Sequence, residues 1–299
     1  MTHAEIEAFL AVCEYHTFTK AAEALFIGQS ALSTRLKNLE DEVGCRLLIR
    51  SKGQREIELT WEGKQFYELA IQYRDILQKM QDISGSELRG RIRIASIHSL
   101  GTYLLPQVYG RFLETHPSMK MEIQDLNTPE ACDSLERGLT DLSFGTDHRQ
   151  IPGLEIIPVV SEEMVFVCSK ESSYPDRVPL SKLSTGWELY SSWCDTFDSW
   201  HNEAFGVHAQ PRVKLELMRQ LEYFLTKSEN WAIVPYSVAV NMLESGNVRL
   251  CEMEFSVPPR ITYCLSRTGS AHHPAVGPFL DCLKETVASM DSRYIRTLL

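Results

Sequence analysis

The stretch FTKAAEALFIGQSALSTRLKNLEDEVGCRLLIR, residues 18–50, decides how the N-terminal part of this chain folds. Apolar side chains recur in it at spacings of four, three and four residues, at Leu32, Leu36, Leu39 and Val43. This spacing forms one stripe along a helix, because an α-helix turns once about every 3.6 residues. The opposite face carries the small, polar or basic side chains of Ser30, Ser33, Thr34 and Lys37. The stretch therefore predicts an amphipathic helix with a polar, basic face.

A shorter helix is predicted just before it. Residues 19–25 (TKAAEAL) are rich in alanine, and such small side chains let a second helix cross closely. Phe26, Ile27 and Gly28 follow as a tight break, in which Gly28 takes the turn or caps the next helix. Two helices joined by a short, glycine-containing turn are typical of a helix-turn-helix, whose second helix enters the major groove of DNA by its N-terminal end.

The residues predicted to contact DNA gather around that end of the second helix. Those expected to meet bases are Gln29, Ser30, Ser33 and Thr34, with Thr19 on the preceding helix, whereas Arg35 and Lys37 lie nearer the phosphates. Residues 29–55 hold six basic and three acidic side chains in a chain of net charge −10, so basic charge is concentrated where phosphates would lie. The alternative is an ordinary solvated helix in a helical bundle.

Flanking segments complete a predicted DNA-binding domain. A helix over residues 4–15 places Ile6, Phe9, Leu10 and Cys13 on one face, which we expect to pack on the two helices above. Residues 45–48 and 57–59 are expected to form the two strands of a wing, with residues 51–55 as its polar tip. Three basic residues of this wing are predicted to contact DNA: Arg50, Lys52 and Arg55.

A long helix is predicted from Thr60, its expected N-cap, to about residue 83. Apolar residues alternate in it at spacings of three and four: Phe66, Leu69, Tyr73, Ile76, Met80 and Ile83. A narrow stripe of this period is typical of a helix that pairs with a second helix, so we predict dimerisation through it. The alternative is that the stripe packs on the chain's own domains. Residues 84–90 form the predicted linker.

From residue 91 onward, expected strands alternate with expected helices. Strands are predicted at 91–96, 119–124, 141–145, 154–160 and 164–168, with helices at 100–116 and 130–137. A second unit follows, with strands near 187–190, 212–217 and 231–234 and a helix over 218–227. The chain is expected to return to the first unit near residues 262–266. Such alternation predicts parallel sheets with right-handed crossovers.

The N-terminal motifs resemble one known family. The run AAEALFIGQSALSTRLKNLEDEVGCRLLIR (residues 21–50), followed by LTWEG (59–63), is similar to the winged helix-turn-helix of LysR-type transcriptional regulators. Where the family usually has Ser or Thr this chain has Gly28, and where it often has Arg the chain has Thr34. Glycine is an acceptable N-cap, but the second departure shifts an expected base contact towards Arg35.

The resemblance implies an α+β multidomain fold with an N-terminal winged helix-turn-helix, a dimerisation helix and a two-lobed α/β effector domain like a periplasmic binding protein. The implied boundaries are 1–59 for the DNA-binding domain, 60–85 for the dimerisation helix, 86–90 for the hinge, 91–161 with 266–299 for effector lobe I, and 162–265 for lobe II. The implied partners are double-stranded promoter DNA, a small-molecule effector, RNA polymerase and a second copy, with dimers pairing into tetramers. No cofactor and no membrane partner is implied.

The family also implies an effector site between the lobes, where helix N-termini favour anions. Its matching positions in lobe I are Ser96, His98, Ser99, Leu100 and Thr146. In lobe II they are Trp193, Thr196, Met218, Arg219, Asn230 and Trp231. The chain departs from the family where Arg219 replaces a common Ser and where Asn230 and Trp231 replace Gly-Ile.

Aromatic residues are concentrated in the expected second lobe, at Trp187, Tyr190, Trp193, Phe197 and Trp200. Together with Ser, His and Arg219 they would suit a small organic anion with an apolar or cationic part. The alternative is a tryptophan-rich core for the lobe. For His98 the alternatives are binding of a carboxylate, pH sensing and a helix cap.

Other functions find less support in the sequence. The eight cysteines show no C-x-x-C and no metal-ligand spacing, which argues against zinc and a disulfide framework. A thiol switch would use Cys194, which has no near sequence neighbour to resolve it. No phosphate-binding loop, dinucleotide fingerprint or G-x-S-x-G supports an enzyme. The absence of a signal peptide and of a membrane-length apolar run predicts a cytoplasmic protein. A regulator whose C-terminal part binds no ligand remains the main alternative.

Overall fold

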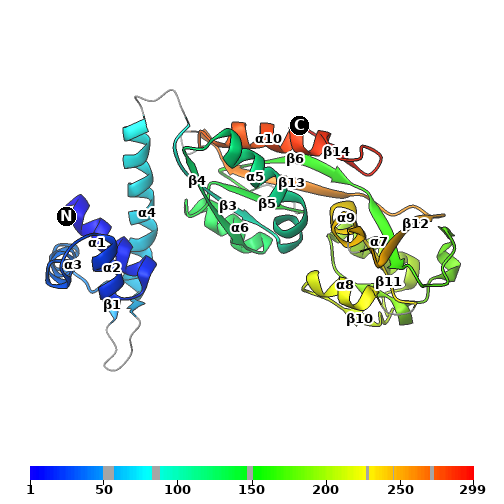
Figure 1. The fold of residues 1–299 in the computed structure, drawn as a ribbon. Coiled ribbons are helices and arrows are strands. Elements are labelled where there is room, and N and C mark those ends of the chain that lie inside the picture. Colours follow the sequence, from blue (N-terminus) through cyan, green and yellow to red (C-terminus); the bar gives the residue numbers. More distant parts are fainter. Residues whose placement is uncertain (50–56, 83–87, 147–150, 227–228, 245, 270–272) are drawn as a thin grey trace. The chain divides into compact units, whose positions relative to one another are not determined.

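The structure is a computed structural model that describes residues 1–49, 57–82, 88–146, 151–226, 229–244, 246–269 and 273–299. The chain divides into two compact units, one formed by Met1–Gly85 with Arg137–Leu139 and the other by Ser86–Glu136 with Thr140–Leu299 (Figure 1). None of the described helices is long and apolar enough to cross a membrane.

The first unit is a winged helix-turn-helix followed by one long helix. Its elements are α1 (His3–Tyr15), α2 (Phe18–Ala24), α3 (Gln29–Val43), β1 (Leu48–Ile49), β2 (Glu58–Leu59) and α4 (Trp61–Asp82). The predicted stripe of α3 is buried at Leu32, Leu36 and Leu39, which pack against α1 in one apolar cluster. Val43 is 39% exposed because the helix ends beside it, at Gly44 with φ 81°. The two helices and the amphipathic pattern are thus confirmed.

Local caps explain where these helices begin. Thr17 Oγ1 accepts the N–H of Lys20 at 3.3 Å and starts α2. Thr60 Oγ1 accepts the N–H of Gly63 at 2.8 Å and donates to the carbonyl of Arg46 at 2.7 Å, so the predicted cap of α4 is confirmed and also ties the helix to the wing. The wing strands are antiparallel and short, with Leu48 opposite Leu59, and the predicted tip 51–55 lies outside the described residues.

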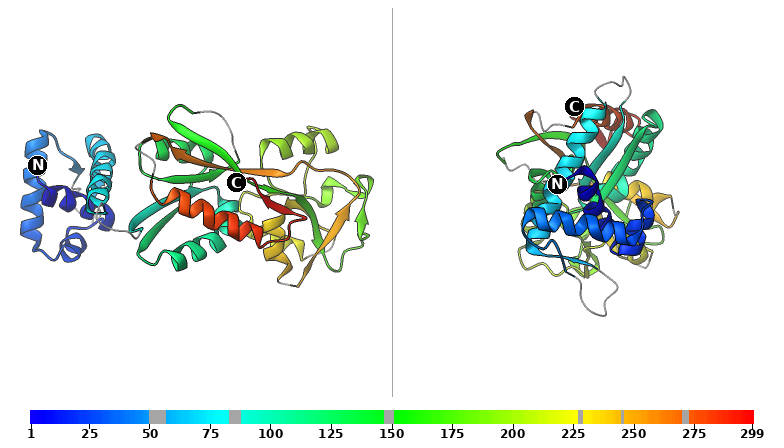
Figure 2. Two further views of the ribbon diagram at one scale, coloured as in Figure 1. Left: turned by 90° about the horizontal axis from the view of Figure 1, so that it is seen from above. Right: turned by 90° about the vertical axis from the view of Figure 1, so that its left-hand side faces the viewer.

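The second unit has two lobes, each built around one larger sheet. Lobe I has a six-stranded sheet in the order β14-β6-β13-β5-β3-β4. Its strands are β3 (Gly90–Ser96), β4 (Met119–Asp125), β5 (Leu142–Gly145), β6 (Leu154–Glu162), β13 (Arg260–Arg267) and β14 (Ile295–Thr297). The π-helix η1 (Leu100–Leu104), α5 (Leu105–Thr115) and α10 (Val276–Ala288) share its main apolar cluster, whereas α6 (Thr128–Glu136) packs on a smaller one. Figure 2 shows the ribbon from two further sides, with α10 in red.

Lobe II has a four-stranded sheet in the order β11-β7-β12-β8 and a two-stranded sheet of β9 and β10. Its elements are β7 (Met164–Ser169), β8 (Arg177–Val178), η2 (Leu180–Lys182), η3 (Thr185–Trp187), β9 (Leu189–Tyr190), α7 (Asp195–Phe205), β10 (Val213–Lys214), α8 (Arg219–Leu225), β11 (Trp231–Pro235), α9 (Tyr236–Leu243) and β12 (Val248–Met253). Trp193, Phe197 and Trp231 are buried in its core, and Tyr190 and Trp200 pack partly on it, so most of the aromatic-rich segment belongs to the core, whereas Trp187 is 38% exposed.

The prediction of parallel sheets is correct only in part: in lobe II, β9 pairs in parallel with β10 and β8 with β12, but both sheets of four or more strands are mixed. β3 pairs in parallel with β4 and β5, but β13 runs antiparallel to β5 and β6, and β7 runs antiparallel to β11 and β12. The physical reason is that the chain crosses between lobes and returns, so β13 enters the first sheet from the opposite end. Because β13 pairs along its whole length from Arg260, the return crossing precedes Arg260 and does not lie near residues 262–266.

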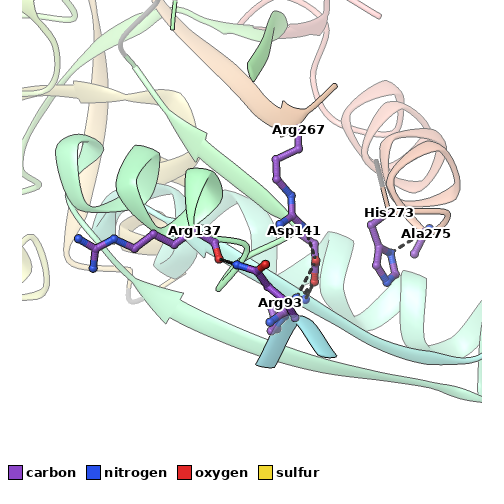
Figure 3. Close-up of polar contacts among 7 residues, drawn as sticks. Arg93, Arg137, Asp141, Arg267, His273 and Ala275 are labelled. Carbon is purple, nitrogen blue, oxygen red and sulfur yellow. Dashed lines mark hydrogen bonds and ion pairs between the residues drawn. The ribbon is translucent and has the colours of Figure 1, made fainter. Parts of the chain in front are cut away.

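A buried ion pair joins three strands of lobe I (Figure 3). Asp141, directly before β5, accepts hydrogen bonds from the side chain of Arg93 at 3.0 and 3.1 Å and from its backbone N–H at 2.9 Å. Arg267 donates to the same carboxylate at 3.3 Å. Asp141 and Arg93 are almost fully buried, so this cluster links β3, β5 and β13 inside the lobe.

Candidate DNA-binding face and effector cleft

The predicted DNA contacts gather at the N-terminal end of α3. Gln29 is its first residue, and Gln29, Ser30, Thr34 and Lys37 are exposed, whereas Ser33 and Arg35 are partly exposed. Gln29 Nε2 donates to Thr19 Oγ1 at 2.9 Å, which brings Thr19 of α2 to the same face. A side chain held in this way is preorganised to present its amide oxygen to a base edge.

Two observations refine this face. Thr34 Oγ1 donates to the carbonyl of Ser30 at 2.9 Å, so its hydroxyl already has a partner within the helix. Arg46, exposed after the end of α3, lines a hollow together with Ser33 and Lys37, and it was missed in the sequence analysis. Its position just after Gly44, on the way into the wing, was the available signal. The predicted contacts Arg50, Lys52 and Arg55 lie outside the described residues.

The apolar stripe of α4 divides into two sets. Phe66 and Tyr73 are partly buried against the unit's own cluster; the Phe66 ring lies edge-on to Phe9, with centroids 5.1 Å apart. For these two residues the own-domain alternative is therefore correct, because they lie on the side of the helix near buried Ala70. Leu69, Ile76 and Met80 are 62%, 52% and 60% exposed. Ile83 lies outside the described residues.

A cavity of about 360 Å³ lies between the two lobes of the second unit. Five predicted effector residues line it: His98, Ser99, Thr146, Trp193 and Met218. The remaining described lining residues are Ile97, Asp125, Leu126, Asn127, Thr128, Ser192, Cys194 and Asp195. Asp125 is the last residue of β4, and Asp195 is the first residue of α7. Polar residues at strand ends and helix starts were the signal that could have found them.

The other predicted effector residues do not line this cavity. Ser96 is buried beside Gly101 of η1, and Leu100, the first residue of η1, is buried in the main apolar cluster of lobe I. Trp231 is fully buried, stacks on Phe166 and donates to the carbonyl of Ser184 at 3.0 Å. Asn230 is buried, where it accepts from Arg212 and donates to the carbonyl of Phe224. The polar side-chain atoms of Trp231 and Asn230 form hydrogen bonds within the protein. These residues therefore stabilise the structure of the lobes.

Two exposed residues also fall outside the lining. Thr196 Oγ1 lies 3.2 Å from Cys194 Sγ; Cys194 and Asp195 line the cavity, whereas Thr196 does not. Arg219 is exposed at the start of α8 and lies close to Tyr103 of η1. Burial raises the pKa of Tyr103, and the positive charge of Arg219 partly opposes that shift. Arg219 therefore lies near the lobe boundary but does not line the cavity.

The charges that line the cavity are mainly negative. His98 Nδ1 lies 2.6 Å from Asp125 Oδ2, and Asp195 stands on the opposite lobe. The N-terminus of α7 carries Asp195 and Asp198 in its first turn, and that of α6 carries Glu130, which also bonds the backbone N–H of Asn127. These carboxylates already complement the helix dipoles, so the helix starts of the cleft attract an added anion only weakly.

A fully buried arginine lies behind the cavity. Arg260, the first residue of β13, pairs with Glu162, the last residue of β6, through bonds of 2.5 and 3.1 Å. Its remaining nitrogen donates to Ser99 Oγ at 3.0 Å, and its guanidinium lies 6.0 Å from the centre of the Trp193 ring. Glu162 also accepts the N–H of Ser237 at the start of α9. The Arg260–Glu162 pair thus contacts two residues that line the cavity, Ser99 of lobe I and Trp193 of lobe II. Through Ser237 it also bonds α9 of lobe II.

The closest pair of cysteines does not include Cys194, the residue that a thiol switch would use. None of the eight cysteines forms a disulfide, and Cys194 Sγ lies 3.2 Å from Thr196 Oγ1. Cys168 of β7 and Cys251 of β12 lie 3.7 Å apart, sulfur to sulfur, inside lobe II. The hydrogen bond from Cys251 lowers the pKa of Cys168 to about 7. Among the described residues no group of three or more His, Cys, Asp or Glu could hold a metal ion.

Comparison with known proteins shows the family. The model described as "LysR substrate binding domain" matches residues 85–288, and the model described as "Bacterial regulatory helix-turn-helix protein, lysR family" matches residues 3–64. The chain belongs to the LysR family. The resemblance and the multidomain LysR architecture inferred from the sequence are thereby confirmed.

Individual LysR-family relatives agree with this assignment. The chain is 35% identical to the "HTH-type transcriptional regulator BenM" of Acinetobacter baylyi over 139 residues, 46% of this chain and 45% of BenM. It spans about half the length of such curated relatives. The crystal structure of the probable transcriptional regulator PA0477 from Pseudomonas aeruginosa shares the fold, with a TM-score of 0.72, 17% identity and coverage of 95% and 97% of the two chains. The structure of full-length CbnR with its target DNA also shares the fold, with a TM-score of 0.67 and 20% sequence identity. The match covers 96% of this chain and 100% of CbnR.

Proposed function

We propose that this LysR-family chain is a sequence-specific DNA-binding transcriptional regulator whose C-terminal unit senses a small molecule. The observation that carries the proposal is the exposed N-terminal end of α3, where Gln29 is held by Thr19 and flanked by Ser30 and Ser33. Such a face suits base edges in the major groove, while Arg35, Lys37 and Arg46 suit the phosphates. The matching relatives are transcriptional regulators, which supports regulation over catalysis.

The test is an electrophoretic shift assay on DNA selected by the chain from a random duplex pool. Replacing Gln29 or Ser33 with Ala should weaken specific binding by about 1–3 kcal/mol for each lost base contact. Glu203→Ala, an exposed change on α7 in the other unit, is the matched control and should bind as the unchanged chain does. Unaltered affinity in both the Gln29 and Ser33 variants would show that α3 does not read DNA in this way.

The effector site is proposed to be the cavity between the lobes. Its described lining includes the carboxylates of Asp125 and Asp195, one from each lobe, and no lysine or arginine. This lining favours a ligand with an ammonium group or several hydrogen-bond donors over the organic anion predicted from the sequence. Asp125 already has His98 as a partner at 2.6 Å, so a cation that also bound Asp195 would connect carboxylates of both lobes and favour lobe closure. The apolar side, formed by Ile97, Leu126 and Met218, suits a short hydrocarbon part.

A matched panel of small molecules tests the effector class. Thermal unfolding of the full chain would be followed with short alkyl amines and diamines, and with carboxylates of the same chain lengths. We expect amines to raise the Tm by binding the folded state, and Asp125→Asn or Asp195→Asn to remove that rise. If only carboxylates raise the Tm, the proposal that the effector is a cation is overturned, but the proposal that the unit senses a small molecule is kept. If neither class changes the Tm, the structural, non-binding alternative for this unit is favoured.

The active form is proposed to be a dimer joined through the exposed stripe of α4, and dimers are proposed to pair into tetramers. Two copies so joined would present two recognition helices to half-sites related by a twofold axis. Effector binding would then change lobe closure and, through it, the spacing or bend of the bound DNA. Contact with RNA polymerase at the promoter is part of the same proposal.

A further inference from the structure

The turn between α2 and α3 is closed by a Schellman motif. The N–H of Phe26 donates to the carbonyl of Glu23 at 3.1 Å, and the N–H of Ile27 donates to the carbonyl of Ala22 at 3.0 Å. Leu25 is the C-cap of α2, so Phe26 is the first residue beyond it. This motif needs a left-handed backbone at that residue, and Phe26 has φ 54°. Glycine usually occupies the position, because it lacks a Cβ.

Phenylalanine is a costly choice at this position for two reasons. Its Cβ strains the left-handed backbone, which only Gly, Asn and Asp adopt readily. Its ring is also 96% exposed, whereas Leu25 and Ile27 on either side pack partly on the core of the unit. Gly44 adopts the left-handed backbone at the end of α3 with no Cβ to strain it and no apolar side chain to expose. Neither the turn nor the core of the unit therefore explains this side chain.

The position of Phe26 indicates what the ring contacts. It lies three residues before Gln29, at the end of α3 that carries the exposed polar residues, and Gly28 between them adds no bulk. The exposed side chains that follow it on α3, such as Gln29, Ser30 and Lys37, are uncharged or basic, which suits a polyanion, whereas Glu23 of α2 is exposed and acidic. In the major groove of DNA, thymine presents a methyl group to apolar side chains, and the deoxyribose presents C–H groups beside it.

We propose that Phe26 is a DNA-contacting residue whose ring packs on apolar surface of the operator, a thymine methyl or the adjoining deoxyribose. This proposal rests on the proposed function, because α3 must be the recognition helix. The left-handed backbone directs the ring out of the unit. Burial of the ring against DNA would offset the free-energy cost of that conformation and of exposing the ring in the free protein. Phe26 would thus add an apolar contact beside the polar ones of Gln29 and Ser33.

The decisive variant is Phe26→Asn, because it separates stability from binding. Asparagine tolerates the left-handed backbone, so we expect the Tm of the first unit to rise by about 2–5 °C. Binding to DNA selected by the unchanged chain should nevertheless weaken roughly tenfold, since the apolar contact is lost. The salt dependence of binding should stay the same, because no phosphate contact is removed. Phe26→Tyr should keep most of the affinity, because it keeps the ring.

Two further arms locate the contact and control for the change. Duplexes made with deoxyuridine in place of thymidine lack the methyl group. If they weaken binding of the unchanged chain more than that of Phe26→Asn, the contact is to thymine methyls; equal weakening assigns it to deoxyribose. Val43→Asn, which makes an exposed apolar residue polar at the far end of α3, should leave affinity unchanged.

The outcomes also separate this proposal from the proposed function. Full affinity in Phe26→Asn, with weakened binding in Gln29→Ala, would overturn the role of Phe26 and keep α3 as the recognition helix. Full affinity in both variants would overturn both. A parallel loss of stability and affinity in Phe26→Asn would also overturn the proposal, because it would show that the ring supports the turn.

Discussion

At the residue scale, Asp141 shows most directly how one buried charge holds a sheet together. It neutralises Arg93 and also accepts from Arg267 inside lobe I, with 2% of its own side chain exposed. Asp141→Asn keeps the size but leaves buried guanidinium charge without its counter-ion. We expect the free energy of unfolding of the second unit to fall by about 3–5 kcal/mol, as measured by denaturant titration.

Asp281→Asn provides the matched control, because Asp281 is exposed on α10. Surface changes of this kind shift stability by less than about 0.5 kcal/mol. Equal stability of the two variants would show that the buried charge of Asp141 is not required.

Gly63 gives a second prediction for a single residue. A Cβ added there would lie 2.0 Å from the carbonyl oxygen of Leu47 and 3.2 Å from Thr60 Oγ1. Backbone atoms cannot yield as a side chain can, so Gly63→Ala should push α4 away from the wing. We expect a loss of about 1–3 kcal/mol in the stability of the first unit. Gly277→Ala, with nothing within 4 Å of the added Cβ, is the control and should keep the Tm of its own unit.

Gly63 also shows what could not be predicted from the sequence for a single residue. The LTWEG motif was sufficient to indicate a family, but no pattern in it specifies that the glycine passes a backbone carbonyl. Phe26 illustrates the same limit, because its φ depends on the hydrogen bonds that end α2. Periodicity predicts which side chains are buried; it does not predict close approaches of backbone.

At the element scale, α4 carries the clearest prediction. Leu69, Ile76 and Met80 leave an apolar stripe in water along a helix whose other side packs on its own unit. Ile76→Glu should break a dimer formed through this stripe, because each copy would then bury a carboxylate. Analytical ultracentrifugation should show the change from dimer to monomer.

Tyr223→Glu tests whether loss of any exposed apolar residue has this effect. Tyr223 is 63% exposed on α8 of the other unit, and this variant should remain dimeric. An intact dimer in Ile76→Glu would exclude the stripe as the interface.

The period of apolar residues predicted where helices and strands occur better than it predicted which elements they pack against or pair with. The spacing of apolar residues gave α1, α3, α4 and most strands of lobe I, because one buried face imposes it. It could not separate Phe66 and Tyr73 from Leu69 and Ile76, since a small rotation around the helix decides which side chains the core covers. It also missed the antiparallel pairing of β13, because strand direction depends on where the chain re-enters a sheet.

At the scale of the whole effector unit, the cleft is assembled from segments that are distant in sequence. Asp125 and Asp195 come from different lobes, and family positions alone did not identify them. Predicted positions such as Leu100, the first residue of η1, and Trp231, the first residue of β11, are in the core instead, because their apolar side chains pack inward on apolar neighbours.

The Arg260–Glu162 pair offers a test of how the lobes are joined. Both side chains are fully buried where β6 and β13 leave lobe I, and Glu162 also bonds the start of α9. Arg260→Met should cost about 3–5 kcal/mol of stability, because it leaves the carboxylate buried without its partner. Combining Arg260→Met with Glu162→Gln should recover much of that loss, because no unpaired charge then remains. Denaturant titration of the single and double variants measures this coupling.

The same variants test whether the pair also shapes the cleft. Arg260 bonds Ser99 and lies beside Trp193, and both of these residues line the cavity. The double variant should therefore regain stability yet respond less to any amine that stabilises the unchanged chain, since Ser99 and Trp193 lose their common anchor. Ser289→Ala, which removes a hydroxyl from the end of α10, should keep the full response. A double variant with recovered stability and an unchanged ligand response would show that the pair serves the fold alone.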